Sequence, residues 1–170
     1  MTQVLILMGS DSDAAIMSAA ADVLTEFGVT WKMTVASAHR SPARVLKLVA
    51  DAPANGTRVF IVGAGSAAHL AGVVAAHTIR PVIGVPIDAS ALKGMDALLS
   101  TVQMPQGVPV ATVAIGKSGA TNAGVLAVQM LALADEALAA RLVAYKRTLA
   151  EKVEAAAARL ESTLAPSGRD

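Results

Sequence analysis

The residues best suited to chemistry form one short stretch, Ser37-Ala38-His39-Arg40-Ser41-Pro42. Histidine can give and take a proton near neutral pH, and arginine can bind a phosphate or carboxylate through a planar set of donors. The stretch follows an apolar, β-rich run and precedes a helix-like run. His39 and Arg40 are therefore predicted to lie in the loop leaving the C-terminal end of a strand, the edge of an open α/β sheet where ligands bind. An ordinary solvated surface loop is the alternative that this stretch alone leaves open.

A second candidate site is the polar run Gly9-Ser10-Asp11-Ser12-Asp13, which follows an apolar run at residues 4–8. Its serines and aspartates are typical of residues that cap a helix. The free N–H groups at the start of a helix also bind anions. Because the carboxylates would repel a phosphate, we expect hydroxyl and N–H groups beside the phosphate and an aspartate on a sugar such as ribose.

A third candidate site is the small-residue run Gly63-Ala64-Gly65-Ser66-Ala67-Ala68-His69. It fits the pattern GxGxxA after a strand, and Asp88 follows the next strand at about the spacing of a ribose-binding acid, which raises a dinucleotide-binding hypothesis. The run lies on the third strand-to-helix turn and not on the first, which weakens that hypothesis. Its small residues would let the backbone approach a ligand closely and leave a tight apolar cavity. His69 could be a helix cap or a ligand contact.

Short apolar runs alternate with helix-like segments, and these elements must position the three sites. Strands are expected at residues 4–8, 31–36, 59–62, 82–85 and 110–115. Helices are expected at residues 14–27, 43–50, 67–79, 91–100, 120–134 and 135–164. This alternation predicts an α/β fold of three layers, a doubly wound parallel sheet covered by helices on both faces. Ser41 and Pro42 are predicted to start their helix, with the serine hydroxyl as its cap.

The C-terminal part departs from a plain doubly wound unit. The helix expected at 120–134 is apolar on nearly every face, so it must be buried, and a domain of this size seldom buries such a helix alone. We expect it to pack against other subunits. The last helix is amphipathic and suits docking or oligomer packing. We expect one domain over residues 1–170, with a core at 1–134, a C-terminal helix at 135–164 and a flexible tail at 165–170.

The composition points to an oligomer. Hydrophobic residues make up 54% of the 170 positions and charged residues 16%, against about 25% charged in an average soluble protein. So few charges cover a monomer's surface poorly, which favours a homo-oligomer with large buried apolar faces. The net charge is +1 and basic runs are absent, so nucleic acid is not expected as a partner.

Other function classes are also disfavoured. The chain has no cysteine, and His39, His69 and His77 are its only histidines, so no metal site is predicted. The N-terminus lacks the basic segment of a signal peptide. The longest apolar stretch, residues 123–134, contains Gln129 and is shorter than the roughly 20 residues of a membrane span. We therefore expect a soluble cytoplasmic protein without membrane contact.

Together these motifs resemble the PurE family of de novo purine synthesis, the N5-carboxyaminoimidazole ribonucleotide mutases. The resemblance covers about residues 4–133. The matching stretches are Met8-Gly9-Ser10-Asp11-Ser12-Asp13, Ser37-Ala38-His39-Arg40-Ser41-Pro42, Gly63-Ala64-Gly65-Ser66-Ala67-Ala68-His69-Leu70, Pro81-Val82-Ile83-Gly84-Val85-Pro86, Val102-Gln103-Met104-Pro105-Gln106-Gly107-Val108-Pro109-Val110 and Ala114-Ile115-Gly116-Lys117. The Ala-Ala-His-Leu run is similar to the mutase class and not to the animal-type carboxylase. Ser66 and Ala71 stand where mutases often have glycine and proline, which would alter the rigidity of that loop.

The resemblance implies a reaction that moves a carboxylate from the exocyclic nitrogen of an aminoimidazole ribonucleotide to ring carbon C4, without ATP, metal or organic cofactor. It implies that His39 carries the proton. The implied substrate-binding residues are Arg40, Ser10, Ser12 and Ser37 at the 5′-phosphate, Asp13 at the ribose, Ala64 and Gly65 in the small-residue loop, and His69 and Leu70 at the base or in loop closure. It also implies a homo-octamer.

Several other functions stay open at this point. An aminoimidazole ribonucleotide carboxylase would use CO₂ directly. A non-catalytic nucleotide-binding scaffold would keep Arg40 and Asp13 but would have no need of His39. The expected fold, a flavodoxin-like doubly wound parallel sheet with a long C-terminal helix, would also suit a flavin-dependent electron carrier. The GxGxxA pattern would suit a dehydrogenase.

Overall fold

The computed structural model describes residues 1–164 and divides into two compact units, Met1–Leu131 and a second unit that begins at Ala132. The second unit consists mainly of α6 (Glu136–Leu164). The division falls three residues before the expected end of the core at residue 134. A single domain over residues 1–170 stays a prediction, and the expected tail at 165–170 lies outside the described residues.

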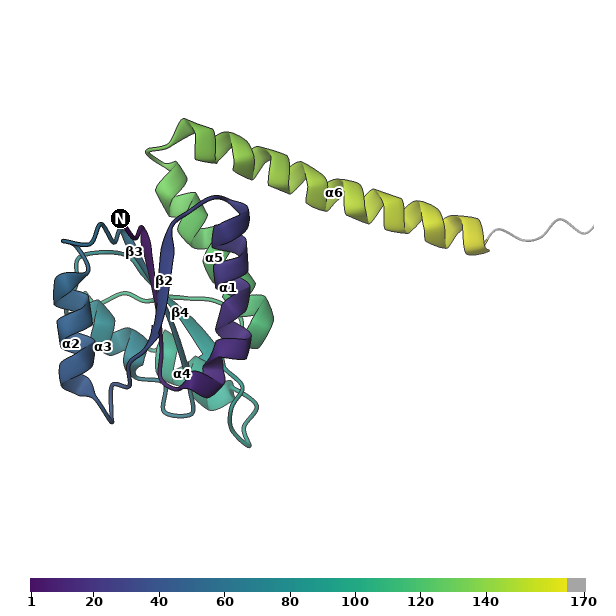
Figure 1. Cartoon of the computed structure of the whole chain (residues 1–170). Coiled ribbons are helices and arrows are strands. Elements are labelled where there is room, and N and C mark those ends of the chain that lie inside the picture. Colours follow the sequence, from purple (N-terminus) through teal and green to yellow (C-terminus); the bar gives the residue numbers. More distant parts are fainter. Residues whose placement is uncertain (165–170) are drawn as a thin grey trace, which may run out of the picture. The chain divides into compact units, whose positions relative to one another are not determined.

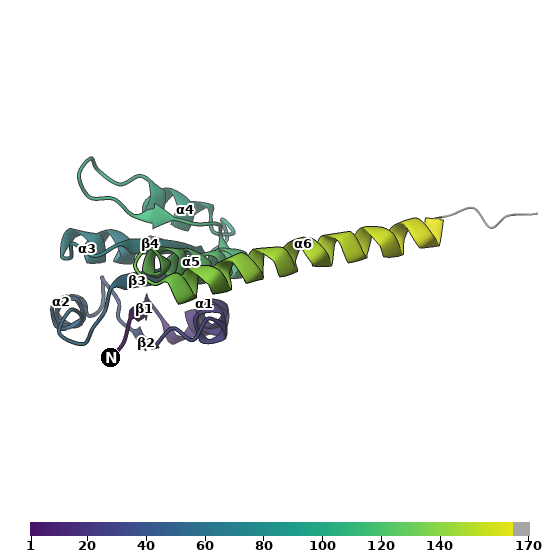
Figure 2. The ribbon, with the colours of Figure 1, turned by 90° about the horizontal axis from the view of Figure 1, so that it is seen from above.

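The first unit is built on a five-stranded parallel sheet with the strand order β2-β1-β3-β4-β5. Its strands are β1 (Val4–Met8), β2 (Trp31–Val35), β3 (Val59–Gly65), β4 (Val82–Ile87) and β5 (Ala111–Thr112). Its helices are the 3₁₀ turn η1 (Asp11–Asp13), α1 (Ala14–Glu26), α2 (Pro42–Asp51), α3 (Leu70–Ala76), α4 (Met95–Val102) and α5 (Gly116–Ala132). Helices α2 and α3 lie on one face of the sheet and α1 and α5 on the other (Figures 1 and 2). The α/β doubly wound fold and the long C-terminal helix are confirmed.

The core follows from the apolar runs of the central strands. Every residue of β1 is buried, because successive side chains point to opposite faces and both faces are covered. Leu5 and Leu7 share one buried cluster with Phe60 of β3 and with Val45 of α2. On the opposite face Met17 of α1 packs against β3 at Gly63.

The third and fourth strands are longer than expected. The sequence predicts a loop at Gly63, Ala64 and Gly65, but these residues continue β3 and pair with residues 85–87 of β4. That part of the prediction is wrong because packing overrides the low strand propensity of glycine. A Cβ at Gly63 would collide with the Met17 sulfur, and one at Gly65 would lie 3.0 Å from Cβ of Ala89. The small residues at the C-terminal edge of the sheet are therefore held in place by strand pairing.

Left-handed residues explain two further differences. Ser66 has φ of 53° and turns the chain out of β3, so α3 begins at Leu70 and not at residue 67. Lys93 and Gly94, with φ of 50° and 84°, delay α4 to Met95. The fifth strand has only two residues, although the Val113 N–H still donates to the Gly84 carbonyl. The apolar helix begins earlier than expected, at Gly116.

Helix α5 approaches the preceding backbone so closely that only glycine fits at position 119. A Cβ there would collide with the carbonyl oxygen of Ala114. We expect Gly119→Ala to lower the free energy of unfolding by about 3 kcal/mol, because backbone yields less readily than a side chain. Urea denaturation measures the change.

The control is Gly72→Ala in α3, where the added methyl would meet the flexible side chain of Met104, at 3.0 Å from its sulfur. We expect that change to stay within about 1 kcal/mol, since alanine also favours the helix. Equal losses in the two variants would contradict the packing argument.

Candidate active site

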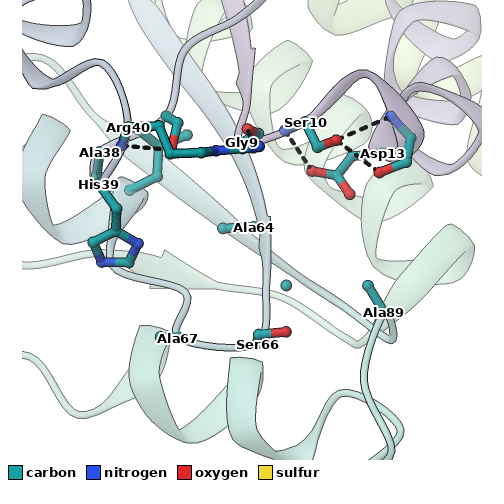
Figure 3. A pocket seen from close by; sticks show the side chains of 14 residues that line it. Gly9, Ser10, Asp13, Ala38, His39, Arg40, Ala64, Ser66, Ala67 and Ala89 are labelled. Carbon is teal, nitrogen blue, oxygen red and sulfur yellow. Dashed lines mark hydrogen bonds between the residues drawn. The ribbon is translucent and has the colours of Figure 1, made fainter.

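Three loops meet at the C-terminal edge of the sheet, after the neighbouring strands β2, β1 and β3. They enclose a cavity of about 300 Å³ (Figure 3). It is lined by Gly9, Ser10, Ser12, Asp13, Ser37, Ala38, His39, Arg40, Ala64, Gly65, Ser66, Ala67, Leu70 and Ala89. The residues proposed from the sequence as catalytic or substrate-binding thus gather around one cavity, with the exception of His69, which contacts the His39 ring.

The loop after β1 is held by a capping box. The Ser10 hydroxyl accepts the Ser12 N–H at 3.4 Å, and the Asp13 carboxylate accepts the Ser10 N–H at 3.1 Å. The Ser12 hydroxyl donates to the Ser10 hydroxyl oxygen at 2.9 Å. Helix capping by these residues is therefore confirmed, and it leaves two serine hydroxyls at the cavity edge in fixed positions.

Burial determines the direction in which the pKa of Asp13 is shifted. Its side chain is buried, and desolvation raises its pKa, while the Ser10 N–H and the Arg40 charge act in the opposite direction. A carboxyl group whose pKa is higher in the folded than in the unfolded state adds stability below its unfolded pKa. That contribution is lost as the pH rises through the folded pKa. Ionised Asp13 therefore weakens the fold at neutral pH.

We expect Asp13→Asn to raise the free energy of unfolding at pH 7, because asparagine can still accept the Ser10 N–H bond and carries no charge. The gain should fade as the pH falls below the ordinary range of an aspartate, where the carboxyl is protonated in both states. Urea denaturation at several pH values measures this. The exposed Asp22 in α1 supplies the control, Asp22→Asn. An equal gain at acid and neutral pH would contradict the burial argument.

The loop after β2 is closed by Ser37 and Ser41. The Ser41 hydroxyl accepts the Ser37 N–H at 3.1 Å and donates to the Ser37 carbonyl at 3.2 Å. Pro42 is the first residue of α2, as predicted, but the Ser41 side chain makes no cap bond to that helix. The predicted hydroxyl cap is wrong because the hydroxyl is used within the loop. The Ser37 hydroxyl in turn accepts the Arg40 N–H at 3.2 Å.

Arg40 reaches from its own loop to the loop after β1. Its Nη2 donates to the Gly9 carbonyl at 2.8 Å, which places the guanidinium beside Ser10 (Figure 3). The side chain is exposed. A guanidinium has five N–H donors, so one bond to a carbonyl leaves others for an anion.

The two histidines of the site face each other. Nε2 of His39 lies 2.8 Å from Nδ1 of His69, and the ring centroids are 5.0 Å apart with the planes at 85°. His39 lines the cavity. His69 stands at the N-cap of α3 but makes no side-chain cap bond, so the cap alternative for it is wrong. His77, at the other end of α3, is exposed, and its Nδ1 contacts the Val73 carbonyl at 2.8 Å.

Small residues close the cavity opposite the polar loops. Ala64, Gly65, Ser66 and Ala67 line it, whereas Ala68 is 1% exposed and belongs to the core. Ala89 also lines the cavity, from the turn after β4, and was not predicted from the sequence. The glycines of the GxGxxA pattern lie in a strand and not in a turn, so the dinucleotide-binding hypothesis loses its structural basis.

The described residues lack two kinds of feature, a metal site and a membrane span. Within residues 1–164 no three His, Cys, Asp or Glu side chains come together in a way that could hold a metal ion. Over the same range, no helix combines the length and the apolar composition needed to cross a membrane.

Comparison with known proteins gives concordant results. A family model described as AIR carboxylase matches residues 3–152. A Brucella melitensis protein named N5-carboxyaminoimidazole ribonucleotide mutase is 51% identical over 88% of this chain and 93% of its own length. A Mycobacterium tuberculosis protein of the same name is 50% identical over 97% and 94%. The crystal structure of Treponema denticola PurE superposes with a TM-score of 0.83 at 27% identity, covering 97% of this chain and 99% of that one.

Proposed function

Because this chain belongs to the AIR carboxylase family, we propose that it moves the carboxylate of N5-carboxyaminoimidazole ribonucleotide from the exocyclic nitrogen to ring carbon C4. The product is 4-carboxy-5-aminoimidazole ribonucleotide, an intermediate of purine synthesis, and the enzyme is an isomerase. The names of relatives that align over nearly their whole length favour this mutase reaction over direct carboxylation by CO₂.

The observation that carries the proposal is one cavity that combines a histidine, an arginine and small apolar residues. The histidine suits proton transfer, the arginine suits a phosphate, and the small residues suit a neutral CO₂ molecule. A non-catalytic nucleotide scaffold would need Arg40 and Asp13 but not the histidine.

The polar side of the cavity would bind the ribose phosphate. Arg40 would hold the 5′-phosphate together with the hydroxyls of Ser10, Ser12 and Ser37. The bond from Arg40 to Gly9 supports this role because it orients the guanidinium before substrate arrives. Asp13 would accept a ribose hydroxyl. Leu70, buried at the cavity wall, would contact the base.

The chemistry would run through His39. The protonated imidazole gives its proton to the exocyclic nitrogen as the N–CO₂ bond breaks and CO₂ is released. Carbon C4 then attacks CO₂ and forms the new C–C bond, and the neutral imidazole removes the C4 proton. One proton is given and one is taken, so the enzyme returns to its starting state. Ala64, Gly65 and Ala67 would keep water from the CO₂.

Turnover of N5-carboxyaminoimidazole ribonucleotide by the purified protein, without ATP or bicarbonate, tests the proposal. Rapid formation of the C4-carboxylated product, followed by its absorbance, is the expected result. Carboxylation of aminoimidazole ribonucleotide at high bicarbonate with no mutase turnover would instead identify a carboxylase. Absence of product in both assays would favour the non-catalytic nucleotide-binding scaffold.

We also propose that the protein is a cytoplasmic homo-octamer. Large apolar side chains at the surface of the first unit support assembly: Trp31, Val35, Leu92, Met95 and Leu99 are 37–65% exposed. In α6 the apolar residues Val143, Val153, Leu160 and Leu164 are 60–72% exposed. Analytical ultracentrifugation measures the assembly, and a monomer would contradict it.

A further inference from the structure

The contact between His39 and His69 joins two loops that leave different strands. His39 follows β2 and His69 follows β3, with β1 between them in the sheet. Their facing nitrogens, Nε2 of His39 and Nδ1 of His69, are 2.8 Å apart, which is hydrogen-bond distance. While this contact lasts, one of the two nitrogens carries a hydrogen and the other presents a lone pair. Protonation of both would set two N–H groups against each other.

Within residues 1–164 the His69 side chain has no structural role apart from this contact. It makes no cap bond to α3, and it is not among the residues that line the cavity. The side chain is exposed, so it is not held by core packing. Its one hydrogen-bond contact within residues 1–164 is the His39 ring.

We infer that His69 is a positioning residue, which accepts a hydrogen bond from Nε2 of His39 and thereby fixes the orientation and tautomer of that ring. The inference rests on the proposed proton transfer by His39. It gives His69 a role through the His39 ring, in place of the direct substrate contact expected from the sequence.

The direction of the hydrogen bond follows from the reaction. His39 must both give and take a proton, so the nitrogen facing the substrate has to alternate between N–H and a lone pair. Nδ1 has no hydrogen-bond partner within residues 1–164, whereas Nε2 is engaged by His69. If His69 were the donor, neutral His39 would keep its hydrogen on Nδ1 and could not remove the C4 proton. With His69 as acceptor, Nδ1 of His39 presents a lone pair in the neutral ring and carries a hydrogen in the cation.

The same bond serves both states of the cycle. When His39 is neutral, its Nε2–H donates to the lone pair of His69. When His39 is a cation, that bond becomes charge-assisted and stronger, which stabilises the proton-donating state. The ring therefore has no need to turn between the two proton transfers. This is the general arrangement of an acid–base histidine oriented by a second group.

Replacement of His69 tests this role in steady-state kinetics. We expect His69→Phe, which keeps a ring but has no acceptor, to lower kcat by roughly 10- to 100-fold, a part of what a positioned acid–base group contributes. KM should change little because His69 does not line the cavity. His69→Asn places an amide oxygen near the position of Nδ1, and we expect it to restore kcat to within a few-fold of wild type. His77→Phe, at the other end of α3, is the control.

Nitrogen-15 NMR of the histidine rings in the free enzyme gives a second readout. In wild type we expect neutral His39 to carry its hydrogen on Nε2, and in His69→Phe we expect a mixture of the two tautomers. His77 is the internal reference in the same spectra. An unchanged tautomer in His69→Phe together with an unchanged kcat would overturn the inference. Absence of mutase turnover in wild type would overturn the proposed function instead, and the NMR result would still report on the pair.

Discussion

Replacing His39 with asparagine is expected to lower kcat of the carboxylate transfer by about 10²- to 10⁴-fold, the contribution of a positioned proton donor and acceptor. The asparagine amide is polar and fills part of the volume of the imidazole ring, but it cannot transfer a proton. Substrate binding should persist, because the proposed phosphate and ribose contacts come from Arg40, Ser10 and Asp13. Steady-state kinetics measures kcat, and calorimetry with the product measures binding.

A matched control separates loss of chemistry from loss of a histidine. His77 is also exposed, and the one hydrogen-bond contact of its ring within residues 1–164 is to the Val73 carbonyl, so His77→Asn should keep wild-type kinetics. Near-normal kcat in His39→Asn with normal binding would show that another group carries the proton. The His69 variants would then have no basis either, since His69 acts through His39.

The sequence was sufficient for those parts of the fold that follow from local patterns. The continuous apolar run at Val4–Met8 predicted a strand covered on both faces, and β1 has those bounds. Pro42 predicted the start of α2 because its fixed φ suits the first helical turn. The apolar run before Ser37 and the helix start at Ser41-Pro42 predict that His39 and Arg40 lie in the loop leaving the C-terminal end of a strand, and they lie between β2 and α2.

Features that depend on contacts distant in the sequence were not predictable. Glycine disfavours strands, yet Gly63 continues β3 because Met17 of α1 occupies the space that a side chain would need. The Ser41 hydroxyl could bond either the backbone N–H groups at the start of α2 or the backbone of Ser37. Only the folded loop shows that it bonds Ser37. The strand order β2-β1-β3 decides that His39 meets His69, and neither spacing nor composition contains that order.

The two departures from the family pattern differ in their surroundings. Ser66 has φ of 53°, a conformation that glycine adopts without steric cost, so this position tolerates serine at some strain. Ala71 is 2% exposed, and a Cβ on Gly84 would lie 3.5 Å from its methyl group, so it belongs to the core near β4. The effect of either residue on loop rigidity stays a prediction.

The second large effect is expected for Arg40→Ala, which should raise KM by about 10- to 100-fold, the factor expected when a hydrogen bond to a charged group is lost. Arg40 is oriented by the Gly9 carbonyl at 2.8 Å, so little ordering of the side chain is needed when a phosphate binds. The inhibition constant of inorganic phosphate should rise together with KM. Arg58→Ala removes an equal charge just before β3, at the opposite edge of the sheet, and should leave both constants unchanged. Unchanged KM in Arg40→Ala would contradict the phosphate assignment.

Arg40→Ala should also change the pH dependence of stability through Asp13. The Arg40 charge favours ionised Asp13 and so limits the rise of its pKa that burial causes. Without Arg40 the folded-state pKa rises further, and ionised Asp13 weakens the fold more at neutral pH. Below the unfolded-state pKa that extra loss is absent, because the carboxyl is protonated whether the chain is folded or not. Adding Asp13→Asn to Arg40→Ala should therefore abolish the loss at neutral pH, whereas a loss that persists in the double variant would mean that Arg40 stabilises the loops mainly through its bond to Gly9.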